Sequence, residues 1–405
     1  MRLLLTQARI LDVHEGVYRP GLDILVERGS IARLSETPVR EPVDRVIDLA
    51  GRTVLPGLID AHVHVIAVTD LVRLANLSPY LVAARAKTIM QEMLLRGFTT
   101  VRDAGGADGG LAEAVEEGHF IGPRLRVSGL ALAQSGGQGD FRKGAGHPIG
   151  CPVCRGKRSI TRVVDGPDEM RRAVREELAS GAHQIKVMAS GGLISGIPLD
   201  RLQFSADELA VAVEEARCAG TYVMAHAYET SAIEACLSAG VRSIEHGTLL
   251  ERRTAERMAS ASAFLVPTLA VFETLAETAA SATTASYLQE LLRTGLASLD
   301  VARAAGVRLG FGTDLDSESQ HRQLDELRIR SRVSSNLDII RSATIHNAEL
   351  LSLAAEIGSV TEGKRADLLV YDGDPLADIE VLCRPDSALK LIMTGGSLIK
   401  NDLPN

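Results

Sequence analysis

Two histidines separated by one residue stand at the end of an apolar stretch near the N-terminus. The segment VLPGLIDAHVHV covers residues 54–65 and carries His62 and His64. Residues two apart on a β-strand share a face, so both imidazoles point to the same side. Neutral imidazole is a good ligand for Zn²⁺. The pair therefore predicts a metal site.

Four further polar residues occupy comparable places in other apolar segments. A lone buried histidine is usually a core residue with a satisfied partner, but burying all of these groups without partners would cost several kcal/mol each. A metal centre would remove that cost. The four residues and their segments are Lys186 in QIKVMASGG, His226 in TYVMAHAYE, His246 in RSIEHGT and Asp314 in VRLGFGTDLD.

Lys186 needs its own explanation, because a divalent cation repels an ammonium group. Either Lys186 pairs with a carboxylate such as that of Asp103, or it has reacted with CO₂ to form a carbamate. A carbamate is anionic and has two oxygens, so it can bridge two metals. Two metals about 3.5–4 Å apart turn a bridging hydroxide into a nucleophile at neutral pH.

The elements that must position these residues are short apolar strands that alternate with helical stretches. Eight such alternations predict a (β/α)₈ barrel, in which functional groups collect at the C-terminal ends of the strands. The predicted strands lie in TVLPGLIDAHVH, TTVRDAGG, RLRVSG, QIKVMASGG, TYVMAHAYE, RSIEHGT, FLVPTL and VRLGFGTDLD, and the helical stretches include 81–96, 168–180, 205–219 and 288–305.

The two ends of the chain resemble each other. Segments such as LLLTQARILD near the start and RADLLVYDG near the end read as strands bounded by Gly and Pro. We predict one small β domain built from both termini, over residues 1–55 and 355–405. The barrel then covers 56–354.

Composition limits the class of protein. The 405 residues are 45% hydrophobic and carry a net charge of −8, which allows a large core and argues against a nucleic-acid partner. No run of about 20 apolar residues predicts a membrane span, and we expect a cytoplasmic enzyme. The five cysteines fit a reducing compartment. Cys151 and Cys154 form a CxxC without a second pair, which favours loop thiols or an adventitious disulfide over a metal or redox site.

The segments PGLIDAHVH, IKVMASGG, AHAY, IEHG and GFGTD resemble the amidohydrolase superfamily over nearly the whole chain. RGFTTVRDAGG and QIKVMASGG are most similar to its prolidase-like, imidazolonepropionase-related dipeptidases, a branch related to ochratoxin-degrading amidohydrolases. The resemblance implies a TIM barrel, a terminal β-sandwich domain and a homo-oligomer, with an octamer as one arrangement.

The resemblance also implies two divalent metal ions, Zn²⁺ by default, bridged by a carboxylated lysine. The implied ligands of the more buried ion are His62, His64 and Asp314; those of the second ion are His226 and His246, with Lys186 as the bridge. By the same resemblance, Asp314 passes a proton from the attacking water to the leaving amine. The second ion would polarise the scissile carbonyl.

Candidates for substrate binding follow from position. Tyr228 lies two residues beyond His226 and faces the same side. It is either a rim aromatic or, as the resemblance implies, a hydroxyl that hydrogen-bonds the substrate carbonyl oxygen or oxyanion. The Gly-rich stretch 134–160 contains Arg142 and His147, each of which is either a solvated loop residue or a partner for a substrate carboxylate.

Other loop and isolated residues carry weaker signals. Relatives often have histidine where this chain has Gln138, so a catalytic histidine is not expected at that position. We treat His14, His119, His183 and His321 as surface residues because no matching partner accompanies them.

We therefore expect metal-dependent hydrolysis of an amide bond in a dipeptide or N-acyl amino acid with a free C-terminal carboxylate. Xaa-Pro is the leading substrate, and ochratoxin-like N-acyl-Phe amides are a further option. An alternative is a mononuclear deaminase or cyclic-amidine hydrolase, for which His226 and Glu229 supply a His-x-x-Glu pattern. A third hypothesis is a non-catalytic scaffold, which the complete set of candidate ligands disfavours.

Overall fold

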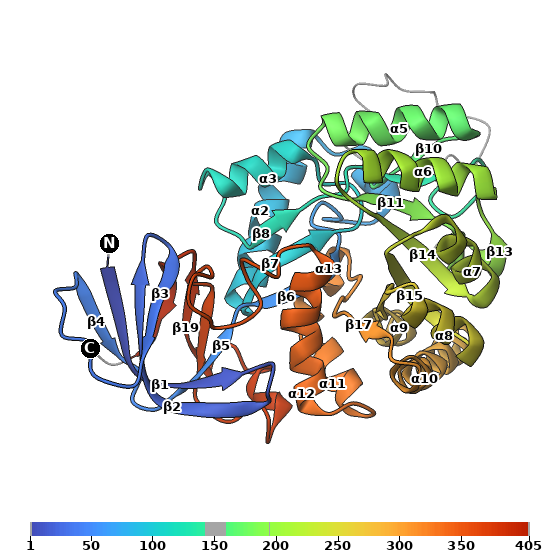
Figure 1. The fold of residues 1–405 in the computed structure, drawn as a ribbon. Coiled ribbons are helices and arrows are strands. Elements are labelled where there is room, and N and C mark those ends of the chain that lie inside the picture. Colours follow the sequence, from blue (N-terminus) through green and yellow to red (C-terminus); the bar gives the residue numbers. More distant parts are fainter. Residues whose placement is uncertain (1, 142–158, 194, 404–405) are drawn as a thin grey trace. The chain divides into compact units, whose positions relative to one another are not determined.

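The computed structural model describes residues 2–141, 159–193 and 195–403 (Figure 1). The chain divides into two compact units, and each is discontinuous in sequence. The first unit comprises Met1–Asp60, Gln91–Thr100 and Leu327–Asn405, and the second comprises Ala61–Met90 and Val101–Glu326. The domain bounds that the sequence suggests, 1–55 and 355–405 for the β domain and 56–354 for the barrel, remain predictions.

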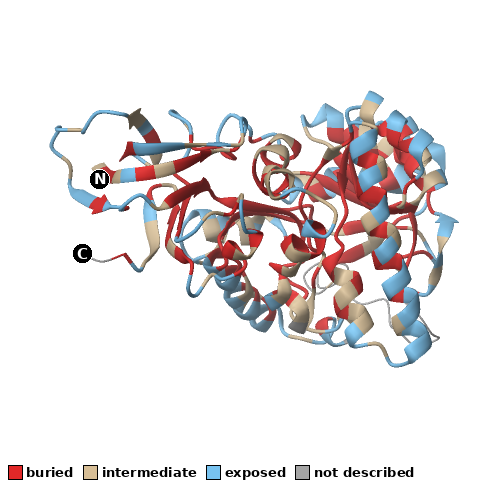
Figure 2. Cartoon of the chain, turned by 90° about the horizontal axis from the view of Figure 1, so that it is seen from below, coloured by how far each residue is buried: buried red, intermediate tan, exposed pale blue. Residues whose placement is uncertain are grey.

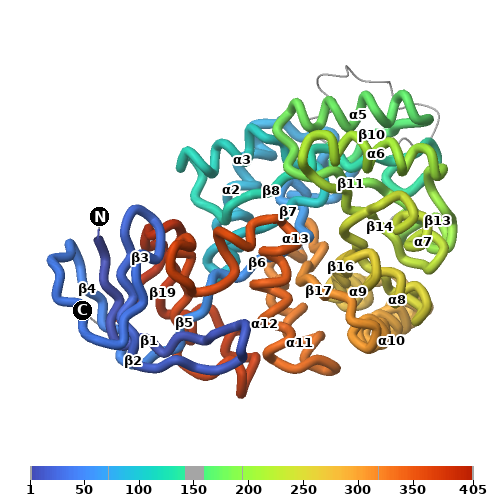
Figure 3. The backbone as a smooth tube through the Cα atoms, in the orientation of Figure 1, coloured from blue at the N-terminus to red at the C-terminus, as the bar shows by residue number. Residues whose placement is uncertain are grey.

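In the first unit, strands from both ends of the chain form one sheet. Its order is β20-β19-β18-β5-β1-β2-β3, with β4 beside β1. Figure 3 shows segments from the two chain ends side by side, where β18 pairs antiparallel with β5. Strand pairing thus joins the termini in a single sheet, whereas the β-sandwich stays a prediction. The strands are β1 Arg2–Asp12, β2 Val17–Glu27, β3 Ser30–Ser35, β4 Arg45–Asp48, β5 Thr53–Pro56, β18 Leu368–Tyr371, β19 Leu389–Thr394 and β20 Ser397–Asn401.

The second unit is built around a parallel sheet in the order β10-β9-β11-β14-β15-β16-β17. Its strands are mostly buried, as Figure 2 shows. Helices cover a parallel sheet on both faces, so its strands consist mainly of apolar residues. A three-stranded sheet, β6-β7-β8, accompanies it. The strands are β6 Leu58–Val63, β7 Phe98–Asp103, β8 Arg124–Arg126, β9 Ala131–Ala133, β10 Thr161–Val163, β11 Ile185–Met188, β14 Val223–Glu229, β15 Ser243–Leu249, β16 Phe264–Val266 and β17 Arg308–Leu309. The hairpin β12 Ser190–Gly192 and β13 Ile197–Leu202 follows β11.

Backbone hydrogen bonds continue the parallel sheet beyond its named strands. The Ala61 N–H donates to Phe311 O over 2.8 Å, which links β6 to the segment after β17. On the other side, the His183 N–H donates to Val127 O over 2.7 Å, which links the residues before β11 to those after β8. These bonds fit the closed sheet of a (β/α)₈ barrel.

Each of the eight predicted strand segments contains a strand, and the first and the fourth each contain two, since QIKVMASGG holds both β11 and β12. TVLPGLIDAHVH is two strands, because β5 pairs in the terminal sheet and β6 begins after Gly57. A side chain on Gly57 would place its Cβ 1.9 Å from Thr99 Oγ1. The close approach of β7 therefore requires glycine at this break.

The four predicted helices are present as α2, α5, α6 and α10. Only α10 differs clearly: it begins six residues before the predicted 288, where the Ser281 side chain caps it by accepting the Thr284 N–H. No described helix is long and apolar enough to cross a membrane. The helices are α1 Leu71–Leu74, α2 Pro79–Leu95, α3 Gly109–Glu116, α5 Pro167–Ala179, α6 Ala206–Cys218, α7 Thr230–Ala239, α8 Arg252–Ser260, α9 Ala270–Glu277, α10 Ala282–Ala304, α11 Asp325–Ser331, α12 Asn336–Arg341 and α13 Asn347–Leu350.

Candidate metal centre

β6 and the residue that follows it bring His62 and His64 together. Both side chains are buried, and each ring nitrogen Nδ1 has an acceptor. His62 Nδ1 lies 2.7 Å from Glu245 Oε2, and His64 Nδ1 lies 3.1 Å from Gly105 O. A carboxylate and a carbonyl only accept hydrogen bonds, so each Nδ1 carries a proton and donates it. Each Nε2 is then left to offer its lone pair to a ligand or a further proton.

Both Nε2 atoms face the same oxygen of Asp314. His62 Nε2 and His64 Nε2 each lie 3.2 Å from Asp314 Oδ1. The Asp314 N–H donates to His62 O over 2.8 Å, which joins this carboxylate to β6. Three donor atoms from these residues lie within 4.8 Å of one another. Two imidazole lone pairs and a carboxylate that converge in this way are the ligand set that a divalent cation prefers.

The ionisation of this group shows how strongly it favours positive charge. Burial opposes the charged form of His64, but Asp314 outweighs it and raises the pKa of His64 above its ordinary value. Burial likewise opposes ionised Asp314, yet His62, His64 and His246 together hold its pKa well below the usual range. The carboxylate is therefore ionised at neutral pH and available to a cation.

The second histidine pair comes from the adjacent strands β14 and β15. His226 Nδ1 lies 2.9 Å from His246 Nε2, and Asp314 Oδ2 lies 3.9 Å from His246 Nδ1. His226 Nε2 donates to Gly191 O over 3.0 Å, which leaves its Nδ1 lone pair directed at His246. Burial lowers the pKa of His226 to about 3 and that of His246 well below its ordinary value. Both imidazoles are thus neutral, as metal ligands must be.

Lys186 is fully buried on β11, the strand beside β14. Burial lowers the pKa of its amine to about 8, although Glu245 and Asp314 favour the charged form. Asp103, the partner that the sequence suggests as one option, instead accepts the backbone N–H groups of Val65, Gly105 and Ala107. The acids that act on Lys186 are thus Glu245 and Asp314.

The backbone is strained at this site. His246 has φ +75°, Asp314 has φ +55° and Thr268, which lies 2.7 Å from His246 Nδ1, has φ +49°. In residues other than glycine, such conformations cost about 1–3 kcal/mol each, and they persist only where the surrounding structure holds them. Strained residues of this kind gather at functional sites, and two of these three are candidate ligands.

Sequence reasoning missed two charged residues behind His62. Arg102 on β7 donates from Nη2 to Glu245 Oε1 over 2.9 Å, and both side chains are completely buried. Although burial opposes the ionised carboxylate, Arg102 and His62 outweigh it and lower the pKa of Glu245 to about 2. The signal that could have found them is a charged residue inside each of two apolar strands, TTVRDAGG and RSIEHGT.

Tyr228 packs on the second histidine pair. Its ring stacks on His246, with 4.7 Å between centroids and an interplanar angle of 14°, and meets His226 edge-on at 4.9 Å. Burial raises the pKa of its hydroxyl, so Tyr228 is a neutral donor. The structure therefore places the ring beside the candidate ligands, as the strand alternation predicts.

The loop candidates give a mixed result. Arg142 and His147, predicted for substrate binding, lie outside the described residues, as do Cys151 and Cys154. Gln138 is buried, and its Oε1 accepts hydrogen bonds from the backbone and hydroxyl of Ser195.

Two residues named from the sequence have other roles in the structure. Glu229 caps α7, because its carboxylate accepts the Ser231 N–H over 3.0 Å. His183, predicted as a surface residue, is half-buried and accepts the Val127 N–H on Nδ1 over 3.1 Å. Its environment differs from the prediction because it sits where β8 and the start of β11 exchange hydrogen bonds.

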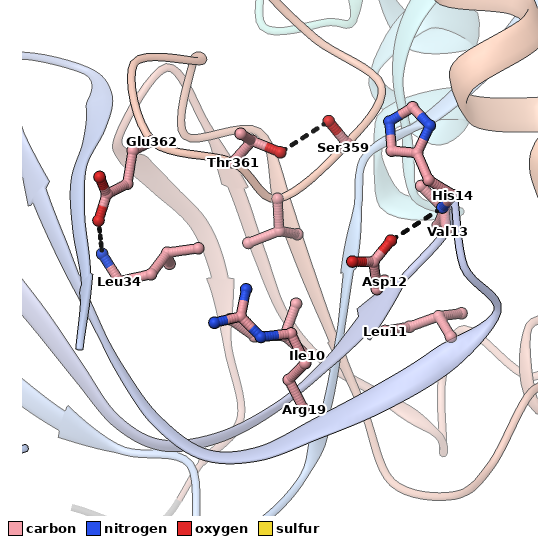
Figure 4. Close-up of a pocket in the computed structure, with 11 residues that line it drawn as sticks. Ile10, Leu11, Asp12, Val13, His14, Arg19, Leu34, Ser359, Thr361 and Glu362 are labelled. Atoms are coloured by element: carbon pink, nitrogen blue, oxygen red, sulfur yellow. Dashed lines mark hydrogen bonds between the residues drawn. The ribbon is translucent and has the colours of Figure 1, made fainter. Parts of the chain in front are cut away.

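A cavity of about 410 Å³ lies in the first unit, and none of the six candidate ligands lines it (Figure 4). Several of its polar groups have partners within the chain. Asp12 accepts the backbone N–H of His14, and Glu362 accepts that of Leu34. We therefore place the candidate chemistry at the histidine cluster.

Comparison with known proteins identifies the family of this chain. The profile of the amidohydrolase family matches residues 53–398. Ochratoxinase of Aspergillus niger is 32% identical over 371 residues, which cover 85% of this chain and 75% of that protein. A crystal structure of a prolidase complexed with N-methylphosphonate-L-proline has a TM-score of 0.95 and 41% identity, and covers 99% of this chain and 100% of that one.

A further crystal structure, of a Xaa-Pro dipeptidase with bound methionine in the active site, has a TM-score of 0.87 and 26% identity over 99% of this chain and 100% of that chain. These are hydrolases, and the family depends on metal, which matches the candidate ligands described above. The chain therefore belongs to the amidohydrolase family and is a metal-dependent amidohydrolase.

Proposed function

We propose that this enzyme hydrolyses the amide bond of a dipeptide or N-acyl amino acid that ends in a free carboxylate. The observation that carries the proposal is the convergence of His62, His64 and Asp314, with the second histidine pair beside them. Xaa-Pro is the first substrate class, supported by the similarity to the prolidase. N-acyl-Phe amides of the ochratoxin type follow, supported by the similarity to ochratoxinase.

We propose that the site holds two divalent ions, Zn²⁺ by default, and that carboxylated Lys186 joins them. Metal ions held by these residues would lower the pKa of a water molecule and would polarise the scissile carbonyl. The depressed pKa of Lys186, about 8, supports the carbamate, because only a neutral amine combines with CO₂. His62 and His64 would serve one ion, and His226 and His246 the other, while Asp314 has an oxygen facing each group.

In this proposal, Asp314 moves the proton. As the water oxygen attacks the carbonyl carbon, Asp314 takes up the proton that the water loses. When the C–N bond breaks, the same carboxyl group delivers that proton to the departing amine. The low pKa of Asp314 keeps it ionised and ready to accept before attack.

Tyr228 is the proposed donor to the substrate carbonyl. Its ring position is set by stacking on His246, and its hydroxyl stays protonated because burial raises its pKa. A neutral hydroxyl stabilises the negative charge that develops on the carbonyl oxygen. Arg142 and His147 remain the proposed partners of the substrate carboxylate. The homo-oligomer stays a prediction from the resemblance, and the cytoplasmic location stays a prediction from the composition.

A mononuclear deaminase or cyclic-amidine hydrolase is the alternative, and Glu229 is the residue on which it depends. That carboxylate caps α7 and accepts the Ser231 N–H, which commits it to a structural role. A mononuclear site also has no use for a bridging carbamate at Lys186. The observations therefore favour the amide hydrolase.

The test is a panel of dipeptides and N-acyl amino acids that differ at the C-terminal residue, with metal content measured on the same sample. We expect two metal equivalents per chain and fastest release of Pro or of a related C-terminal amino acid. Removal of the metal with a chelator should abolish turnover, and Zn²⁺ should restore it. One equivalent together with ammonia release would support the deaminase.

Asp314→Asn tests the proton step. We expect turnover to fall by about 10²–10⁴-fold, the usual contribution of a general acid-base group, while metal stays bound. Asp300→Asn, which removes an exposed acid on α10, is the matched control and should keep full activity. Unchanged turnover in Asp314→Asn would contradict the assigned role.

A further inference from the structure

Behind His62, a hydrogen-bonded network of completely buried polar side chains leads away from the candidate metal ligands. Arg102 and Glu245 are 0% exposed and His62 is 1% exposed. Arg102 Nη2 lies 2.9 Å from Glu245 Oε1, and Glu245 Oε2 lies 2.7 Å from His62 Nδ1. All three residues belong to the second unit of the chain. His62 Nε2, the nitrogen at the end of this network, is the atom that faces Asp314.

The direction of each hydrogen bond in this network follows from the chemistry of its groups. A guanidinium group only donates, and an ionised carboxylate only accepts. Glu245 Oε1 accepts from Arg102 and from Ser243 Oγ, and Oε2 faces His62 Nδ1. Because the carboxylate paired with Arg102 has no proton to give, the proton between Glu245 and His62 comes from His62 Nδ1. That tautomer leaves the lone pair of the imidazole on Nε2, which points at the metal-binding group.

Arg102 also fixes the strand that carries His62. Its Nε donates to Ala61 O over 2.6 Å, immediately before His62 in the sequence. The guanidinium therefore holds both the backbone beside the ligand and the carboxylate that orients the ligand. An isolated buried carboxylate would be costly, and Arg102 neutralises it at the place where it is needed.

We propose that Arg102 and Glu245 are positioning residues that fix the orientation and tautomer of His62 so that Nε2 binds metal. This inference rests on the proposed metal-dependent function. Carboxylates that accept a hydrogen bond from a metal-binding histidine raise its basicity, and their loss typically weakens metal binding 10–100-fold. The competing explanation is that the Arg102–Glu245 pair only stabilises the fold.

Glu245→Gln separates the two explanations, because the shape of the side chain is kept. Arg102 Nη2 lies 2.9 Å from Oε1 and 3.1 Å from Oε2, whereas Ser243 Oγ donates to Oε1 alone. The amide oxygen of the new glutamine therefore takes the Oε1 position, where it keeps both donors, and the weaker Arg102 hydrogen bond is lost. The NH₂ group of the glutamine then faces His62 Nδ1 and donates to it, which moves the imidazole proton to Nε2. We expect the dissociation constant for Zn²⁺ to rise 10–100-fold, measured by competition with a chromophoric chelator.

Glu177→Gln is the matched control. Glu177 is also a buried acid that pairs with an arginine, Arg162, and it accepts the Leu130 N–H over 3.0 Å, but it touches none of the candidate ligands. Both variants should lose stability in the metal-free form, measured by urea unfolding with a chelator present. Only Glu245→Gln should lose metal affinity, and only its Co²⁺-loaded form should show an altered visible absorption spectrum.

Glu245→Asp provides a second variant in case Glu245→Gln does not fold. Aspartate keeps the charge and the acceptor and therefore the tautomer, so its Zn²⁺ affinity should lie between those of the wild type and Glu245→Gln. If Glu245→Gln binds Zn²⁺ as tightly as the wild type, or if Glu245→Asp binds it more weakly than Glu245→Gln, the inference is overturned. A wild-type protein that binds no metal would instead overturn the proposed function.

Discussion

Gly312→Ala should disturb the metal centre without removing a ligand. A methyl group built on Gly312 would lie 2.4 Å from Val266 Cγ1 and 2.8 Å from His62 Cβ. Since carbon atoms in contact prefer about 3.5–4.0 Å, the neighbours must move by about 1 Å. His62 cannot move without weakening the hydrogen bond that its Nδ1 donates to Glu245. Overpacking of this kind costs about 1–3 kcal/mol of stability.

The same shift should reduce activity more than stability. A displacement of about 1 Å at a reacting centre costs about 10²-fold in rate. We expect Gly312→Ala to unfold at lower urea concentration in the metal-free form and to turn over substrate about 10²-fold more slowly. The assay pairs urea unfolding with steady-state turnover of the best substrate from the panel at saturating Zn²⁺.

Gly110→Ala is the control for this substitution. Gly110 is exposed near the start of α3, and a methyl group there would lie 3.4 Å from Asp108 Oδ1, an ordinary contact. Activity should stay unchanged, and stability should rise by up to about 1 kcal/mol because alanine favours a helix. The reasoning is refuted if Gly312→Ala matches the wild type in both turnover and stability.

Two further predictions concern residues away from the ligands. Burial lowers the pKa of His183 to about 4, so between pH 6.5 and 4 the unfolded chain binds a proton that the folded chain does not. The free energy of unfolding should fall as the pH drops through this window, by up to about 3 kcal/mol, and His183→Gln should flatten that fall in urea titrations, whereas His119→Gln should not. Burial also raises the pKa of Cys236 to about 12, so iodoacetamide at pH 8 should label exposed Cys218 in the native protein and label Cys236 only after unfolding. Equal labelling rates for the two cysteines by mass spectrometry would contradict the burial argument.

Local sequence carried much of the fold. The apolar strand segments and the amphipathic helical stretches are recognisable without contacts, because a covered parallel sheet must be apolar and a surface helix must bury one face. The limits of this reasoning appear at particular residues. On α5, Met170, Val174 and Leu178 stand four residues apart, a spacing that predicts one buried apolar stripe. Met170 and Val174 are buried, but Glu177 is buried and Leu178 is only partly so. The partners that make this acceptable, Arg162 and the Leu130 N–H, are far from it along the chain.

The sequence alone also determined which residue types are available for metal chemistry. His62 and His64 share a side because strand geometry has a period of two, and the other candidates stand at equivalent strand positions because parallel strands end at one edge. These are local or topological facts, which spacing can encode. Residues 142–158, with Arg142 and His147, lie in a segment for which spacing predicts no contact.

Only the tertiary structure decided the tautomers, the charges and the partners at the site. Glu245 meets His62 across 183 positions of sequence, and Arg102 reaches Glu245 across 143. No local pattern records such pairs, because they depend on how the sheet closes and on which side chains remain when water is excluded. Asp314 and His246 also adopt left-handed backbone conformations, which residues other than glycine seldom do and which no local pattern predicted here. Contacts between residues far apart in the sequence thus bring a set of suitable side chains together as converging candidate ligands.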